Sequence, residues 1–135
     1  MKKLIVNAKI ENLEIMIQFI LEKTSIITND DKKIENQLRL ALEEALVNVI
    51  NYAYDDDGDI IIKFEEIKKG RIQIQIIDYG IEFDPLKKED PDIMMEIEER
   101  QIGGLGIFMV KQIMDNVTYK RENGMNILTM EKEIK

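Results

Sequence analysis

The sequence contains neither cysteine nor histidine, and each absence removes a class of chemistry. Without cysteine, the chain can form neither a disulfide framework nor a thiolate metal site. Without histidine, it cannot use a histidine general base, a histidine-ligated zinc ion or a phosphohistidine intermediate. No apolar run approaches the roughly 20 residues of a membrane-spanning helix, so we expect no membrane partner.

An excess of basic residues is missing too, because the formal net charge is −8 at pH 7. General nucleic-acid-binding proteins are basic, so we expect no direct contact with nucleic acid. Solubility alone explains the acidic balance, although an acidic surface could also meet a basic partner. The first residues lack the apolar core of a signal peptide, since polar groups return at Asn7, Lys9 and Glu11, and we therefore expect a cytoplasmic protein.

Hydrophobic periodicity divides the 135 residues into strand and helix patterns that fit one domain, residues 1–135. Strand patterns occupy residues 2–10, 59–67, 71–78, 116–122 and 126–133. Helix patterns occupy residues 11–27, a long segment that ends at about Tyr54, and a segment from Gly103-Gly104 to about Met114. This order predicts an α+β fold, in which a mixed and mostly antiparallel sheet carries the helices on one face.

Two polar residues of the predicted long helix, Glu44 and Asn48, are four positions apart and therefore lie on one face, one turn apart. An asparagine side-chain oxygen is a suitable ligand for Mg²⁺. A glutamate one turn away could accept a proton from an attacking hydroxyl group or water. Taken alone, the pair fits a solvated helix face better, because the pattern carries little information.

Asp78 follows an apolar strand pattern and precedes Gly80 by two residues. A buried carboxylate requires a partner, and the amino group of adenine is one such partner. A glycine at position 80 would let the backbone approach a flat base closely. An ordinary Asp-x-Gly turn at the strand end explains the same residues equally well.

Three glycines, Gly103, Gly104 and Gly106, precede a helix pattern. Glycines allow backbone amides to face a ligand, and the N-terminus of a helix favours anions such as phosphate. No Gly-Lys-Ser/Thr follows, so this is not a P-loop, and no parallel βαβ unit surrounds it as in a Rossmann fold. A hinge with a helix cap is the alternative interpretation.

Residues 84–102 interrupt the periodicity with two prolines and many charges, around a short helix pattern at residues 93–100. Segments of this length within compact domains are often lids, so we expect a mobile lid over the site. Its cations include Lys87, Lys88 and Arg100. Any of them could contact a phosphate, and all could equally be solvated.

The order of these motifs resembles the ATP-binding fold that histidine kinases, DNA gyrase and the MutL repair proteins share, the Bergerat or GHKL fold. Three longer segments resemble the stand-alone bacterial anti-sigma factor serine/threonine kinases. They are Glu-Ala-Leu-Val-Asn-Val-Ile-Asn-Tyr-Ala-Tyr (44–54), Asp-Tyr-Gly-Ile-Glu-Phe-Asp-Pro-Leu (78–86) and Gly-Gly-Leu-Gly-Ile-Phe-Met-Val-Lys (103–111). The resemblance covers nearly the whole chain and implies a two-layer α/β sandwich.

The resemblance also implies a role for each matching residue, with ATP and Mg²⁺ as cofactors. Glu44 would be the general base, Asn48 the Mg²⁺ ligand and Asp78 the adenine contact. Gly80 would lie under the base, and the glycines at 103, 104 and 106 would line the phosphates. Thr129 matches a threonine that helps to bind adenine, often through water. Tyr52 stands where many relatives carry histidine, and because tyrosine is hydrophobic with a polar tip, we expect it to pack without removing function.

A protein of this family would bind and sequester a sigma factor and would phosphorylate a small antagonist protein on serine or threonine. Phosphoryl transfer depends mainly on positioning and charge neutralisation, with the general base taking the hydroxyl proton. Family members are often homodimers. Two other functions fit the same motifs: a regulatory module that binds ATP without transferring phosphate, and an ATPase that uses water as the acceptor.

Overall fold

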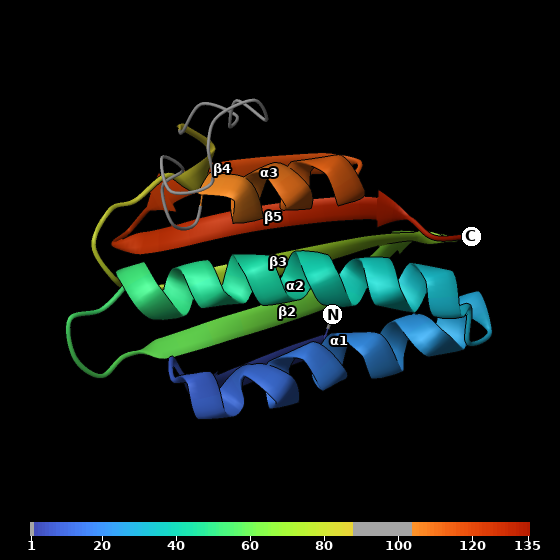
Figure 1. Cartoon of the computed structure of the whole chain (residues 1–135), viewed down its shortest axis with the longest axis horizontal. Helices are drawn as coiled ribbons and strands as arrows, with labels where there is room; N and C mark the ends of the chain where they lie inside the picture. Colours follow the sequence, from blue (N-terminus) through green and yellow to red (C-terminus); the bar gives the residue numbers. More distant parts are fainter. Residues whose placement is uncertain (1, 88–103) are drawn as a thin grey trace.

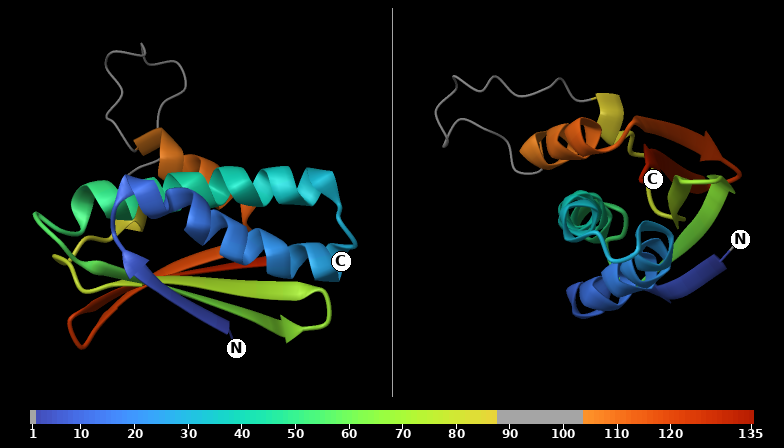
Figure 2. Two further views of the ribbon diagram at one scale, coloured as in Figure 1. Left: turned by 90° about the horizontal axis from the view of Figure 1, so that it is seen from below. Right: turned by 90° about the vertical axis from the view of Figure 1, so that its right-hand side faces the viewer.

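The computed structural model describes residues 2–87 and 104–135 and has two layers, with helices covering one face of a five-stranded sheet (Figures 1 and 2). The strands are β1 Lys2–Asn7, β2 Asp59–Lys68, β3 Arg71–Asp78, β4 Asn116–Glu122 and β5 Met125–Glu133. The helices are α1 Leu13–Thr28, α2 Lys32–Tyr52 and α3 Gly104–Ile113, with short 3₁₀ turns η1 Ile10–Asn12 and η2 Pro85–Lys87. The α+β class and the helices on one face are confirmed.

The sheet has the strand order β1-β2-β3-β5-β4, and each of these neighbouring pairs is antiparallel. The mixed sheet that the sequence allowed is therefore purely antiparallel over the described strands. Two tight turns produce its hairpins. Gly70 has a φ of 80°, and Asn123 and Gly124 have φ values of 52° and 78°, which is the backbone that an Asn-Gly hairpin turn requires.

The hydrophobic core lies between the sheet and the helices. Isoleucines at alternate positions of β2 and β3 point toward the helices and are fully buried, namely Ile60, Ile62, Ile72, Ile74 and Ile76. The buried side of α1 includes Met16, Ile17 and Ile20, and that of α2 includes Leu38, Leu42 and Leu46. These helical positions recur at three- and four-residue intervals, so one apolar stripe of each helix is removed from water.

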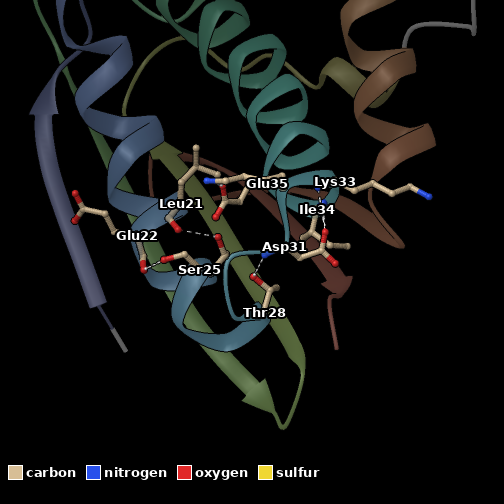
Figure 3. Close-up of polar contacts among 10 residues, drawn as sticks. Leu21, Glu22, Ser25, Thr28, Asp31, Lys33, Ile34 and Glu35 are labelled. Carbon is tan, nitrogen blue, oxygen red and sulfur yellow. Dashed lines mark hydrogen bonds and ion pairs between the residues drawn. The ribbon is translucent and has the colours of Figure 1, made fainter.

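The turn between α1 and α2 fixes where α2 begins (Figure 3). Helix α1 ends at Asn29, which has the left-handed φ of 58°. Asp31 then caps α2, because its Oδ1 accepts hydrogen bonds from the backbone N–H groups of Lys33 at 3.0 Å and Ile34 at 3.3 Å. Helix α2 therefore runs unbroken from this cap to Tyr52, across the middle of the sheet (Figure 1).

In the described part of the chain, none of the helices combines the length and the apolar composition that crossing a membrane requires.

Candidate nucleotide-binding site

Helix α2 presents Asn48 toward the sheet near its C-terminal end. This side chain is only 7% exposed. Its Oδ1 is buried, and no described residue donates a hydrogen bond to it. A buried acceptor without a partner costs roughly 1–3 kcal/mol, so this oxygen is unfavourable in the free protein. A hard cation such as Mg²⁺ takes oxygen ligands of this kind, and the residue therefore fits the predicted metal role chemically.

Glu44 lies one turn before Asn48 on α2, where α3 packs against the helix (Figures 1 and 2). A Cβ at position 106 would overlap the carboxylate of Glu44, so glycine lets α3 come this close without displacing that side chain. The N-terminal turn of α3, which starts at Gly104, is thus held beside Glu44. The structure brings Glu44, Asn48 and Gly106 together at one end of the helical layer.

Asp78 ends β3 and is only 4% exposed. Its Oδ1 accepts two hydrogen bonds, from the backbone N–H of Gly80 at 2.9 Å and from the side-chain amide of Asn126 at 2.8 Å. These donors compensate the burial of the carboxylate, which would otherwise be very unfavourable. The Asp-x-Gly turn and the buried carboxylate, which the sequence offered as alternatives, are both present.

Gly80 is required for a reason that differs from the predicted approach to a base. A Cβ at this position would overlap the backbone carbonyl of Ala53, the residue that follows α2. The next backbone N–H, that of Ile81, donates to the same carbonyl at 3.1 Å. The glycine therefore allows the end of β3 to pack directly on the end of α2.

A small pocket that is partly open to solvent lies between these two ends. Asn48 and Asp78 both line it, together with the rings of Tyr52 and Phe83. These two rings stack with centroids 5.6 Å apart and an angle of 25° between their planes. Tyr52 therefore packs as expected, and its ring forms part of the pocket wall. Flat aromatic walls with a few polar groups are typical of small-molecule sites.

Asn126, on β5, is a pocket residue that the sequence did not indicate. Its Nδ2 donates to Asp78 Oδ1 and, at 2.7 Å, to the carbonyl of Ile81. Its Oδ1 accepts from the Tyr119 hydroxyl, from Arg121 Nη1 at 3.2 Å and from the backbone N–H of Phe83 at 3.4 Å. The usable signal was the alternation of β5, because Asn126 shares its face with two buried apolar residues, Leu128 and Met130.

Thr129 lies outside the pocket. Its neighbours Leu128 and Met130 are buried against the helices, so strand alternation turns Thr129 to the other face of the sheet. There its hydroxyl accepts a hydrogen bond from Gln75 Nε2 at 3.1 Å, across the β3–β5 register. This placement does not bring Thr129 to Asp78 and gives no support to the expected contact with adenine.

Tyr54, just after α2, connects the end of this helix to the start of β2 and the end of β3 through hydrogen bonds. Its hydroxyl donates to the carbonyl of Asp59 at 2.7 Å and accepts from the backbone N–H of Tyr79 at 2.7 Å. Burial raises the pKa of Tyr54 above its ordinary value, so the hydroxyl keeps its proton for this bond. The same ring fills the space beside Gly58, where any side chain would overlap it.

Several predicted features lie wholly or partly outside the described residues. Gly103, Lys88 and Arg100 are outside them, as is most of the predicted lid at 84–102. The part of the lid segment that is described begins with Asp84 and forms the turn η2. Within it, Pro85 is buried in the pocket wall and Lys87 is exposed.

Comparison with protein families agrees with this geometry. A model described as a histidine kinase-like ATPase domain matches residues 6–132. The chain belongs to this family. The resemblance to its serine/threonine kinase branch is confirmed by curated relatives, each named serine-protein kinase RsbW. Those from Bacillus thuringiensis strain Al Hakam and Bacillus cereus strain 03BB102 are each 31% identical over 96 residues, 67% of this chain. The aligned part spans 59% of the length of each relative.

Solved structures show that the ATPase-like domain shares its fold with relatives of much lower identity. A Mycobacterium tuberculosis structure containing RsbU and RsbW domains superposes with a TM-score of 0.66 at 14% identity, covering 99% of this chain and 33% of that one. The catalytic domain of the histidine kinase ThkA gives a TM-score of 0.57 at 14% identity, covering 99% and 98% of the two chains. These likenesses establish the GHKL fold of the domain.

Proposed function

We propose that this chain is an ATP-dependent protein serine/threonine kinase that also acts as an anti-sigma factor. The observation that carries the proposal is the buried Asn48 Oδ1 without a donor among the described residues, one helical turn from Glu44. An unsatisfied buried acceptor lowers stability, so its presence favours a ligand that the free protein lacks. The pocket between Asn48 and Asp78 is where that ligand would bind.

The residues of the pocket fit ATP and Mg²⁺. Asn48 would hold the Mg²⁺ ion through Oδ1, and Asp78 would accept a hydrogen bond from the adenine amino group. Gly104 and Gly106, with Gly103 before them, would line the phosphates at the N-terminus of α3, where the helix dipole favours anions. When bound, ATP supplies the phosphoryl group and Mg²⁺ offsets its charge.

Glu44 would act as the general base in this kinase. Its carboxylate lies beside Gly106, and thus beside the proposed phosphate segment. A carboxylate in this position can take the proton of a serine or threonine hydroxyl as the oxygen attacks. Asn48 would hold the metal one turn away on the same helix. The helix would therefore fix the distance between the metal ligand and the general base.

The partners in this proposal are a sigma factor and a small antagonist protein, which would carry the acceptor serine or threonine. Support comes from the relatives, whose names state serine-protein kinase activity and whose sequences match 67% of this chain. An ATP-binding module without phosphotransfer is the alternative, and only the fate of the phosphate separates the two.

The test compares three variants of α2 in a transfer assay with labelled ATP, Mg²⁺ and the antagonist encoded in the same genome. Glu44→Gln should slow transfer by about 10²- to 10⁴-fold, the usual contribution of a general base, with little change in ATP affinity. Asn48→Ala should weaken both ATP affinity and transfer, because a metal ligand is lost. Glu43→Gln is the matched control, since it removes the neighbouring carboxylate, which lies 3.8 Å from Arg39.

The outcomes are distinct. Equal transfer rates for wild type and Glu44→Gln would remove Glu44 from the role of base. If wild type binds ATP and its partner but transfers no phosphate to any antagonist from its genome, the binding module replaces the kinase. If wild type binds no adenine nucleotide in calorimetry, the pocket assignment itself fails.

A further inference from the structure

The side-chain amide of Asn126 can adopt only one orientation in this structure. Its Oδ1 faces three donors, which are the Tyr119 hydroxyl, Arg121 Nη1 and the backbone N–H of Phe83. Its Nδ2 faces two acceptors, which are Asp78 Oδ1 and the carbonyl of Ile81. A rotation by 180° would set the amide nitrogen against two groups that can only donate, Arg121 Nη1 and the Phe83 N–H, and the oxygen against two acceptors, so the observed orientation is fixed.

The fixed orientation of Asn126 makes the two carboxylate oxygens of Asp78 unequal. Oδ1 already accepts from Asn126 at 2.8 Å and from the Gly80 N–H at 2.9 Å, which occupies both of its lone pairs. No described residue donates to Oδ2. Asp78 is 4% exposed and lines the pocket. The network therefore leaves one acceptor of this carboxylate for a ligand.

Two residues of the edge strand β4 keep the network in this state. Arg121 Nη1 donates both to Asn126 Oδ1 and, at 2.9 Å, to the carbonyl of Gly80, so it holds the turn and the amide together. Tyr119 donates its hydroxyl proton to the same Oδ1. Burial raises the pKa of Tyr119, which keeps the hydroxyl protonated and able to donate.

We propose that Asn126 is a positioning residue that determines base specificity, because it reserves Asp78 Oδ2 for the amino group of the bound purine. This inference rests on the proposed function and deepens it. A base with an amino group at this edge, as in adenine, donates to Oδ2. A base with a carbonyl there, as in guanine, sets its oxygen against a carboxylate oxygen that has no proton to donate, so it is rejected.

The experiment measures the coupling between Asn126 and that amino group. Calorimetry gives the affinities of ATP and of purine riboside triphosphate, which lacks the 6-amino group, for wild type and for Asn126→Leu. We expect wild type to bind ATP about 10-fold or more tightly than the analogue, as for a charge-assisted hydrogen bond. In Asn126→Leu the ratio should fall to about 3-fold or less, because Asp78 is no longer held.

Tyr119→Phe provides a milder variant that keeps the amide and the packing of the ring. Its ratio should lie between those of wild type and Asn126→Leu. Thr118→Ala is the matched control, because Thr118 is the exposed neighbour of Tyr119 on β4 and pairs with Thr129 away from the pocket. Thermal unfolding without nucleotide checks that each variant is folded before its ratio is interpreted.

The results distinguish a failure of this inference from a failure of the proposed ATP binding. If wild type binds neither nucleotide, the proposed ATP site fails. If wild type prefers ATP and both Asn126→Leu and Tyr119→Phe keep its full preference while remaining folded, Asn126 does not position Asp78 and the inference is overturned. A weaker affinity for both nucleotides at an unchanged ratio would show a structural role only, and would overturn it too.

Discussion

The polar contacts around the two ends of α2 differ in how far apart in the sequence the joined residues lie. At the N-terminal end, the polar contacts of the turn join residues a few positions apart, as when Asp31 caps Lys33 and Ile34 (Figure 3). At the C-terminal end, the contacts join residues far apart in the sequence, as when Asn126 binds Asp78. Only the second end contains a buried acceptor that no described residue satisfies, on Asn48.

This difference separates contacts that form the helix from contacts that form a site. Local caps stabilise a helix whatever surrounds it, and solvent can replace them at modest cost. Long-range buried networks hold distant residues in one arrangement when every member is satisfied. An unsatisfied oxygen among such networks lowers stability, and a loss of stability of this kind is typical of a binding site.

The largest effect is expected when the unsatisfied oxygen is removed. Asn48→Leu replaces the buried amide with an apolar side chain of similar size, so the free protein should become more stable by about 1 kcal/mol or more. The same change should weaken Mg²⁺-dependent ATP binding by at least about 10-fold, because the metal ligand is lost. Urea unfolding and calorimetry measure the two effects. A destabilised variant with unchanged ATP affinity would contradict the comparison.

A smaller effect on ATP affinity is expected from Gly80→Ala, which forces a Cβ into the carbonyl of Ala53. Backbone cannot move aside cheaply, so we expect a loss of about 1–3 kcal/mol in the free energy of unfolding and weaker ATP binding. Gly124→Ala is the control. It has open space but a φ of 78°, so it should cost only about 1 kcal/mol, with ATP affinity unchanged. Equal effects of both variants on ATP binding would show that the Ala53 contact does not shape the pocket.

At the other end of α2, Asp31→Ala removes the helix cap. The expected cost is about 1 kcal/mol in the free energy of unfolding, and ATP affinity should stay within error of wild type. Asp31→Asn keeps a capping oxygen and should restore most of the stability. Urea unfolding and calorimetry check both points. Loss of ATP binding in Asp31→Ala would show that the two ends are not energetically separate.

The smallest effect is expected at the exposed ion pair between Glu14 on α1 and Arg39 on α2. Two hydrogen bonds from Arg39, at 2.8 and 3.0 Å, and one from Gln18 lower the pKa of Glu14 from 4.5 to about 2. Because the pKa is depressed on folding, the stabilisation is complete above pH 4.5 and is lost as the pH falls toward about 2. Glu14→Gln should therefore be slightly less stable than wild type at neutral pH. Urea unfolding at falling pH should show this difference shrinking, and a constant difference would exclude the pair as its source.

Most of the fold could be predicted from periodicity because each element buries one apolar stripe or face. The strand pattern at 59–67, for example, corresponds to β2 at Asp59–Lys68, and the long helix pattern to α2. The spacing of Glu44 and Asn48 placed both on one helical face for the same reason. The strand order and the absence of parallel pairs depend on contacts between distant segments, which local patterns do not contain.

The site was less predictable where it depends on cross-strand register. Asn126 meets Asp78 only because β5 pairs with β3 in this register. The alternation of β5 indicates which face Asn126 occupies, but it does not indicate its partner. Tyr119 and Arg121 reach the same network from β4 by a further pairing. Thr129 is different, because its apolar neighbours Leu128 and Met130 already indicated that it faces the other way.

The two glycines Gly80 and Gly106 are expected to differ in which substitutions the protein tolerates. At position 80 the obstacle is the backbone of Ala53, so a variant loses folded protein. At position 106 the nearest obstacle is the end of the Glu44 side chain, which can rotate away, so a variant can fold with that carboxylate displaced. A screen for protein abundance would then detect position 80, and only a screen for activity would detect position 106.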